Sequence, residues 1–187
     1  SSMMVAETAS PKMGDYIIDV CAAPGGKSTH ALSLLPQGSF FVANEPVPLR
    51  ADILAENIIK WGATSAMVTR NNPADFAQFK NFFDMIVVDA PCSGEGMFRK
   101  DDEARKEWSE QNVRLCAERQ DDILGHAWRA LRAGGTLIYS TCTFNREEDE
   151  GSLERFLERF AEEVEASEEV TVEPAWGIVT GRVGAFQ

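Results

Sequence analysis

The chain alternates short apolar runs with longer amphipathic segments, and this alternation limits its fold more than any other feature of the sequence. The short runs are rich in β-branched and aromatic residues, as strands are, and the longer segments repeat apolar residues at helical spacing. The expected strands are 16–20, 40–43, 66–68, 85–89 and 136–140, and the expected helices are 28–35, 48–61 and 112–131. Such alternation predicts an α/β fold with a mostly parallel central sheet and helices on both faces.

Glycine and asparagine residues set several of the expected boundaries. Gly62 is expected to end the helix 48–61, and Gly134-Gly135 to end the helix 112–131. Asn145 is expected to cap one more helix, with Glu148 three residues later completing a capping box. The apolar stripe of that last helix is Leu153, Phe156, Leu157, Phe160 and Val164.

The length of 187 residues suits one domain, which we expect to span 1–187 with its core at about 10–165. With 44% hydrophobic and 26% charged residues and no apolar run near the ~20 residues of a membrane span, the chain is expected to have no membrane segment. Four cysteines and two histidines without a Cys-x-x-Cys pair favour neither a disulfide framework nor a zinc site, so we expect a cytoplasmic protein without metal. The opening Ser-Ser-Met-Met suggests an excerpt of a longer protein.

A formal net charge of −12 argues at first sight against a nucleic-acid partner. However, residues 147–173 hold twelve acidic and two basic residues, a net charge of −10, so the rest of the chain carries only −2. We interpret the acidic run as the solvated face of the last helix and the loop beyond it. A locally basic face elsewhere remains compatible with this composition.

In parallel α/β sheets, ligands bind at the carboxyl ends of the strands, so the residues that follow each strand are the candidate site. Between the first strand and the first helix lies Cys-Ala-Ala-Pro-Gly-Gly-Lys, residues 21–27, where small residues let backbone N–H groups approach a ligand. Glu45 follows the second strand, where an acid accepts hydrogen bonds from a ribose diol. A phosphate-binding loop is disfavoured, because it needs glycine where Cys21 stands.

Two cysteines also follow strands: Cys92 in Asp89-Ala-Pro-Cys-Ser-Gly94, and Cys142 in Ser140-Thr-Cys-Thr143. Each alone is typical of an apolar filler, as we expect for Cys116 on the long helix. Two thiols and the Asp89 carboxyl beside a nucleoside pocket fit methylation of pyrimidine carbon 5. A thiolate that adds to carbon 6 makes carbon 5 nucleophilic, and a carboxyl bonded to ring nitrogen 3 stabilises the charge that develops. Either thiol could reach the crevice.

Three motifs resemble those of the RNA cytosine carbon-5 methyltransferases, the Fmu/Sun family, and within it the bacterial RsmF-type enzymes. They are Asp-Val-Cys-Ala-Ala-Pro-Gly-Gly-Lys at 19–27, Asp-Ala-Pro-Cys-Ser-Gly-Glu-Gly at 89–96 and Tyr-Ser-Thr-Cys-Thr-Phe at 139–144. They occur in family order, and the resemblance covers about residues 10–165. It implies a Rossmann-like fold dependent on S-adenosylmethionine, and an enzyme that makes 5-methylcytosine in RNA.

The resemblance also implies residue roles. Cys142 would add to carbon 6, Cys92 would assist product release, Asp89 would contact the cytosine, and Lys27 matches a family lysine near the nucleophile. Cofactor contacts would come from Cys21, Ala22, Ala23, Pro24, Gly25, Gly26, Lys27, Glu45, Asn72 and Asp89. Asn71 is an alternative to Asn72 for the adenine, because Arg-Asn-Asn-Pro at 70–73 departs from the family pattern.

The expected partner is RNA, with ribosomal RNA as the substrate that the resemblance favours and transfer RNA as the alternative. The segments Met97–Lys100 and Arg105-Lys106 are candidate phosphate contacts at the mouth of the crevice. Family members usually carry further RNA-binding parts, so we expect weak RNA affinity for this chain alone. Other hypotheses are a cofactor-binding or RNA-binding module without catalysis, and a DNA-acting enzyme that would use Cys92 as nucleophile.

Overall fold

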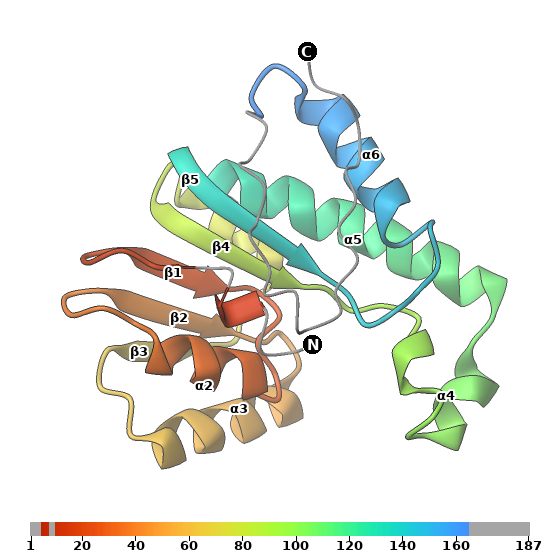
Figure 1. Ribbon diagram of the computed structural model, residues 1–187, viewed down its shortest axis with the longest axis horizontal. Coiled ribbons are helices and arrows are strands. Elements are labelled where there is room, and N and C mark those ends of the chain that lie inside the picture. Colours follow the sequence, from red (N-terminus) through yellow and green to blue (C-terminus); the bar gives the residue numbers. More distant parts are fainter. Residues whose placement is uncertain (1–4, 8–9, 165–187) are drawn as a thin grey trace, which may run out of the picture.

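The computed structural model describes residues 5–7 and 10–164, which form one five-stranded, all-parallel sheet with the strand order β3-β2-β1-β4-β5 (Figure 1). The strands are β1 (Tyr16–Asp19), β2 (Phe40–Asn44), β3 (Ala66–Thr69), β4 (Phe83–Asp89) and β5 (Leu131–Ser140). The helices are α2 (Gly26–Ser33), α3 (Pro48–Trp61), η1 (Pro73–Gln78), η2 (Glu95–Met97), α4 (Asp102–Glu107), α5 (Glu110–Ala130) and α6 (Glu150–Phe160). Every expected strand and helix is present, so the α/β prediction is confirmed.

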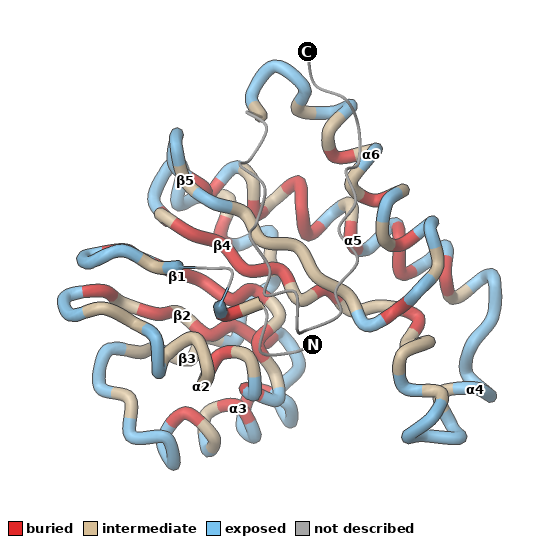
Figure 2. Tube along the Cα trace, in the orientation of Figure 1, coloured by how far each residue is buried: buried red, intermediate tan, exposed pale blue. Residues whose placement is uncertain are grey.

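Helices cover both faces of the sheet, because alternate strand residues enter two separate cores. Ile18, Ile86 and Val88 pack with residues of α5 and α6 on one face. On the other face, neighbouring strand residues such as Ile17 pack with α3 residues such as Leu54. Figure 2 shows the buried residues concentrated in the central strands and along α5, whereas α4 is almost entirely exposed. This period of two along each strand is what a sheet buried on both faces requires.

The strand order reverses between β1 and β4, which are neighbours in the sheet although other strands separate them in sequence. In a doubly wound sheet, this switch point is where a crevice opens beyond the carboxyl ends of the strands. Figure 1 shows the arrowheads of β1, β4 and β5 pointing toward the side of the molecule where η2 and α4 lie. The fold therefore brings the segments after β1, β4 and β5 together.

The expected helix stop at Gly134-Gly135 is wrong. Helix α5 ends at Ala130, and both glycines lie inside β5. The pairing between β4 and β5 shifts there, because Phe83 pairs with Leu131 but Met85 pairs with Thr136. Gly134 has φ +71°, and a Cβ on Gly135 would lie 2.8 Å from a side-chain carbon of Leu131. The two glycines permit an irregularity in the strand. Glycine is common both at such irregularities and at helix ends, so the sequence alone does not distinguish the two.

The prediction that a helix begins at an Asn145 capping box is also wrong. Helix α6 begins at Glu150 after Asp149, although the Asn145 side chain does accept the Glu148 N–H at 3.0 Å. Glu148 is fully buried, so it does not belong to the solvated acidic face. The part of the acidic run at 165–173 lies outside the described residues.

No helix in the described ranges 5–7 and 10–164 is long and apolar enough to cross a membrane.

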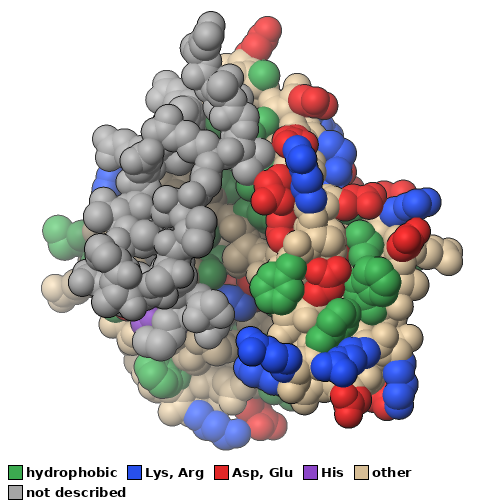
Figure 3. All heavy atoms as spheres, turned by 45° about the vertical axis from the view of Figure 1, so that its right-hand side comes forward, with side chains coloured by type: hydrophobic (Ala, Val, Ile, Leu, Met, Phe, Trp, Pro, Cys, Tyr) green, Lys and Arg blue, Asp and Glu red, His purple; other side chains and the backbone are tan. Residues whose placement is uncertain are grey.

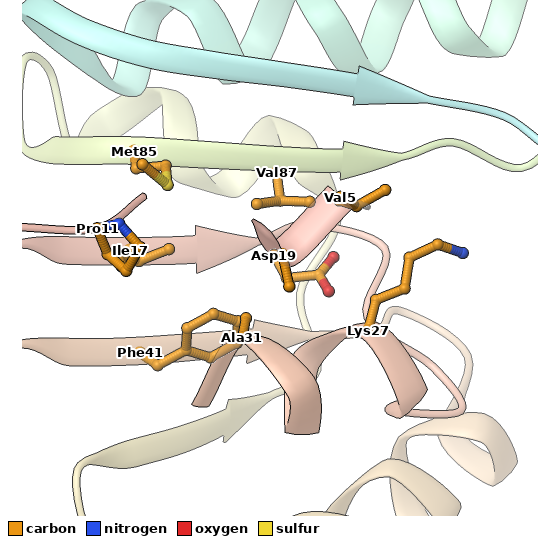
Figure 4. Close-up of a pocket in the computed structure, with 10 residues that line it drawn as sticks. Val5, Pro11, Ile17, Asp19, Lys27, Ala31, Phe41, Met85 and Val87 are labelled. Atoms are coloured by element: carbon orange, nitrogen blue, oxygen red, sulfur yellow. The ribbon is translucent and has the colours of Figure 1, made fainter. Parts of the chain in front are cut away.

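The end of β1 buries an acid, Asp19, of which only 1% is exposed. Ser28 Oγ donates to one carboxyl oxygen at 2.7 Å and the Cys21 N–H donates to the other at 3.2 Å. Figure 4 shows Asp19 between Val87 and Lys27 in a hollow otherwise lined mostly by apolar side chains. Desolvation by burial outweighs the hydrogen bonds and raises the pKa of Asp19 to about 6.

Asp19→Asn should therefore change how stability depends on pH. A carboxyl whose pKa is raised on folding stabilises the protein fully below its unfolded value of 3.8, and this contribution is lost as pH rises through about 6. The loss corresponds to about 3 kcal/mol at neutral pH. The difference in unfolding free energy between variant and wild type, from urea titrations at pH 4 to 7.5, should shift in favour of the variant as pH rises. Parallel curves would contradict this, and Asp52→Asn at an exposed position of α3 is the control.

Candidate active site

A lysine, an acid and a hydroxyl from three different elements meet at the switch point. Lys27 Nζ of α2 lies 2.5 Å from Asp89 Oδ2 at the end of β4. Ser140 Oγ at the end of β5 donates to Asp89 Oδ1 at 2.8 Å. The side chains of Lys27 and Asp89 are each about a quarter exposed, so this ion pair faces solvent from the crevice. Both carboxylate oxygens of Asp89 are oriented by partners far away in sequence.

The two cysteines singled out in the sequence lie side by side, with Cys92 Sγ 3.0 Å from Cys142 Sγ. The Cys142 N–H also points at Cys92 Sγ, at 3.4 Å. Cys142 is exposed and Cys92 is partly exposed, whereas Cys116 is buried on α5 as expected for an apolar filler. The structure thus places both thiols in one solvent-accessible location, although fifty residues separate them.

The thiol pair is electrostatically asymmetric. The hydrogen bond from Cys92 lowers the pKa of Cys142 to about 7, and the nearby Lys27 ammonium acts in the same direction, against desolvation and the Asp89 charge. The pKa of Cys92 is raised, chiefly because its S–H donates to Cys142, with desolvation adding to the rise. Cys142 is therefore the better candidate for a thiolate nucleophile near neutral pH. This asymmetry agrees with the roles that the family resemblance implies.

A buried carboxylate, Glu148, joins the two cysteine-bearing loops. It accepts the Ser93 N–H at 2.9 Å, from the residue after Cys92. It also accepts Gln120 Nε2 of α5 at 2.8 Å and Asn145 Nδ2 at 2.8 Å. Gln120, itself fully buried, donates to the Pro91 carbonyl at 3.0 Å as well. Glu148 is thus a positioning residue that fixes the Cys92 loop against the segment after Cys142.

The glycine-rich turn is rigidly held and leaves a helix end open. Gly25 has φ +109°, and a Cβ there would lie 3.1 Å from Leu54 of α3. Asn57 of α3 donates to the Pro24 carbonyl at 2.7 Å. No side chain among the described residues caps the amino end of α2, and its first turn holds no acid. Its backbone N–H groups and positive dipole end suit the carboxylate of an amino-acid ligand.

Glu45 is placed at the end of β2 as predicted, but it already has internal partners. It is 2% exposed, its Oε1 accepts the Val47 N–H at 2.9 Å, and Arg50 Nη2 lies 3.3 Å from its Oε2. Arg50 also donates to the Ala23 carbonyl of the glycine-rich turn at 3.2 Å. A ribose diol bound to Glu45 would share the carboxylate with Arg50.

The two asparagines after β3 are exposed and take part in local structure. Asn72 caps η1 in a reciprocal capping box with Asp75, and Asn71 Nδ2 lies 3.5 Å from Asp75 Oδ2. The buried Asn44 ties this segment to the sheet, since its Oδ1 accepts the Asn71 N–H at 3.0 Å and its Nδ2 donates to the Val20 carbonyl at 3.1 Å. The choice between Asn71 and Asn72 for an adenine stays a prediction.

Three residues that shape the site are not predicted as site residues by the sequence: Ser140, Glu148 and Glu95. Asn44 is expected at the site edge, and its hydrogen bonds to the segment after β3 are not predictable from the sequence. Ser140 and Asn44 stand at strand ends, so their position at the site edge was visible in the sequence. The sequence pattern identifies Glu148 only as a capping residue. Among the described residues, no cluster of three or more acidic, histidine or cysteine side chains could hold a metal ion.

The rate at which iodoacetamide alkylates Cys142 should rise with pH with a midpoint near 7, the pKa of this thiol. Cys92→Ala removes the S–H donor, so the midpoint of the rate against pH should rise toward 9, the ordinary value for a cysteine. The rate is measured by mass spectrometry of the Cys142 peptide. Cys116→Ala should leave the midpoint unchanged, and an equal midpoint in wild type and Cys92→Ala would refute the assignment.

Glu148→Gln should destabilise the fold, because its amide replaces one acceptor oxygen by a donor, which would face either the N–H groups of Ser93 and Gln120 or that of Asn145. Leaving such buried donors unpaired costs about 2 kcal/mol or more of unfolding free energy. Chemical denaturation measures this cost. The exposed neighbour provides the control, since Glu147→Gln should change stability by less than about 0.5 kcal/mol. Equal stability of the two variants would show that Glu148 does not hold the loops together.

Comparison with solved structures agrees with this architecture. NSun6 from Pyrococcus horikoshii, solved with SFG, has a TM-score of 0.77 at 32% identity over 84% of this chain and 40% of that one. A methyltransferase homolog protein from the same organism has a TM-score of 0.74 at 27% identity over 86% of this chain and 50% of that one. The fold is therefore the Rossmann-like fold of S-adenosylmethionine-dependent methyltransferases.

Curated relatives bear the name ribosomal RNA small subunit methyltransferase F. The protein from Cronobacter sakazakii is 41% identical over 150 residues, which make up 80% of this chain and 31% of that protein. The one from Klebsiella pneumoniae is 40% identical over 152 residues, 81% of this chain and 32% of that protein. This chain thus spans about a third of the length of these relatives. The model of the 16S rRNA methyltransferase RsmB/F family matches residues 6–180, and the chain belongs to that family.

Proposed function

We propose that this chain is the catalytic domain of an enzyme that transfers a methyl group from S-adenosylmethionine to carbon 5 of a cytosine in small-subunit ribosomal RNA. The observation that carries the proposal is the apposition of Cys92 and Cys142, 3.0 Å apart, beside the Lys27–Asp89 ion pair. A methyltransferase acting on an exocyclic amine needs no thiol. Family membership and the relatives named small-subunit methyltransferases support ribosomal RNA as the substrate.

The residues around the glycine-rich turn fit S-adenosylmethionine, which supplies an electrophilic methyl group when bound. The uncapped amino end of α2 suits its carboxylate, and Glu45 is the candidate partner of its ribose. The NSun6 structure, solved with the S-adenosylmethionine analogue SFG, supports this cofactor. Asn72, with Asn71 as the alternative, is assigned to the adenine. No metal is required by this chemistry.

In the proposed reaction, the Cys142 thiolate forms a bond to carbon 6 of a cytosine splayed out of its stack. Asp89, held by Lys27 and Ser140, contacts the cytosine ring, and the Lys27 ammonium beside it stabilises the negative charge that develops there. Electrons of the ring then form the bond from carbon 5 to the methyl group, whose bond to the sulfonium sulfur of S-adenosylmethionine would break and leave its electron pair on that sulfur. The carbon-5 proton is removed, its bonding electrons restore the ring double bond, and Cys142 leaves as a thiolate.

Cys92 is the candidate acceptor of that proton. In the free protein its pKa is raised chiefly because its S–H donates to Cys142. Once the Cys142 sulfur is bonded to carbon, it is no longer a thiolate acceptor and this cause disappears. Cys92 can then lose its own proton and act as a base next to the departing sulfur. We therefore assign the two cysteines sequential roles.

The net charge of −12 disfavours RNA binding by this chain, and the chain covers only about a third of the relatives' length. We expect weak RNA affinity for this chain alone, with additional affinity from parts that the relatives possess beyond the matched third. A ribosomal RNA substrate also agrees with the cytoplasmic location expected from the sequence.

RNA that contains 5-azacytidine tests the roles of the thiols, because the adduct formed on this base cannot release Cys142. The wild type should form a covalent complex that survives denaturing electrophoresis. Cys142→Ala should abolish the complex, because the bond to carbon 6 cannot form. Cys92→Ala should retain it, because addition precedes the step assigned to Cys92.

Three outcomes would contradict the proposal in different ways. Loss of the complex in Cys92→Ala but not in Cys142→Ala would exchange the roles of the two thiols, as in the DNA-acting alternative. Absence of any complex with the wild type, together with S-adenosylmethionine binding by calorimetry, would indicate a module without catalysis. A complex with transfer RNA but not with small-subunit ribosomal RNA would assign the alternative substrate.

A further inference from the structure

An exposed group of large apolar side chains lies immediately beside Cys142. Phe144, two residues beyond Cys142, is 79% exposed, Met97 is 40% exposed and Trp108 is 37% exposed. We call these three residues the aromatic patch. Figure 3 shows hydrophobic side chains gathered around acidic groups on the face that carries η2 and α4, with Lys and Arg side chains close by. Burial of an exposed phenyl ring against a partner would be favourable, because it removes apolar surface from water.

One carboxylate, Glu95, holds Phe144 and Trp108 of the aromatic patch. Its Oε2 accepts the Phe144 N–H at 3.0 Å, and its Oε1 accepts the Trp108 indole N–H at 3.0 Å. Asn145 Nδ2 donates to the same carboxylate at 3.3 Å. Desolvation acts against ionisation of Glu95, but these hydrogen bonds prevail and lower its pKa. Glu95 therefore stays ionised and links the backbone of Phe144 to the side chain of Trp108.

The aromatic patch is also fixed relative to the candidate nucleophile. The Gly96 N–H donates to the Cys142 carbonyl at 2.7 Å, so η2 is joined directly to the Cys142 segment. A Cβ on Gly96 would collide with that carbonyl, so only glycine permits this approach. Two residues of chain span about 7 Å at most, so Phe144 lies within one nucleotide's reach of Cys142. The exposed ring is thus presented at a defined place.

Basic side chains lie in sequence between Met97 and Trp108 of the patch. In the described part of the chain, Arg99, Lys100 and Arg105 form no ion pair, whereas Lys106 is paired with Glu103 at 2.5 Å. Arg and Lys without partners next to exposed aromatic rings are what a single-stranded nucleic acid requires, since the cations meet phosphates and the rings meet bases. A splayed-out target cytosine leaves its neighbours without a stacking partner on one side.

We propose that the aromatic patch, with Phe144 as its main surface, stacks against the nucleobase next to the target cytosine. The inference rests on the proposed function, because it takes the base at Cys142 to belong to RNA. Stacking of this kind accepts any base, since every base has a π-face. Phe144 would contribute to binding of the RNA without taking part in bond formation.

The test measures how adduct formation with 5-azacytidine RNA depends on RNA concentration. Phe144→Ala should raise the half-saturating RNA concentration by about 5- to 150-fold, the range for loss of one base–aromatic stack. Phe144→Trp should retain the wild-type value, because it keeps a π-face. Phe144→Leu should behave like Phe144→Ala, because it keeps apolar volume without a ring. The plateau rate at saturating RNA should be unchanged in all three variants.

Ile59→Ala on α3, where the side chain is 77% exposed like that of Phe144, is the matched control and should leave the RNA dependence unchanged. A wild-type value in Phe144→Leu would overturn stacking and indicate an apolar surface for a protein segment. A lower plateau rate at an unchanged half-saturating concentration would also overturn it, since Phe144 would then only position Cys142. If the wild type forms no adduct, the proposed function itself fails.

Discussion

The buried Glu148 carboxylate is the constraint on which the rest of the site depends. The thiols of Cys92 and Cys142 approach to 3.0 Å although their loops leave different strands. Pairing of β4 with β5 brings the loops to the same edge, but it does not fix their side chains. Glu148 does so by accepting hydrogen bonds from Ser93 in one loop and Asn145 in the other, while Gln120 anchors it to α5. A buried charge is tolerated there because donors surround it.

The asymmetry of the thiol pair follows from this arrangement. The more exposed Cys142 accepts a hydrogen bond and lies near the Lys27 ammonium, so its pKa falls to about 7. Cys92 donates that hydrogen bond and keeps its proton. The same geometry that brings the sulfurs together thereby makes Cys142 the more acidic thiol of the pair. The Lys27–Asp89 ion pair lies beside the two thiols.

Much of the fold was predictable from the sequence because strand and helix periodicities are local. The helix 48–61 begins and ends as predicted, and the five strands lie within a few residues of their predicted positions except β5. The convergence of Lys27, Asp89, Cys92 and Cys142 was predictable from the rule that parallel strands present their carboxyl ends at one edge. Assigning the roles of the two cysteines required the family resemblance, since their relative pKa values depend on contacts across fifty residues.

The sequence was misleading where one residue type has two structural uses. Gly134-Gly135 has the composition of a helix stop but forms an irregularity in β5. Asn145 and Glu148 have the spacing of a capping box and do form its hydrogen bond, yet Glu148 is needed in the interior. Long-range partners decide these cases, and a sequence pattern within a few residues does not contain them. The same holds for Glu95, which lies at hydrogen-bonding distance from Phe144, forty-nine residues away.

The central claim is that two thiols share one solvent-accessible place, and binding of phenylarsine oxide tests it most directly. This reagent forms two arsenic–sulfur bonds with a pair of adjacent thiols and releases water. Intact-mass measurement should show one arsenical per chain in the wild type, and the account predicts loss of binding in both Cys92→Ala and Cys142→Ala. Cys21→Ala and Cys116→Ala should bind as the wild type does. Retention of the arsenical in Cys92→Ala or Cys142→Ala would contradict the apposition of the two sulfurs.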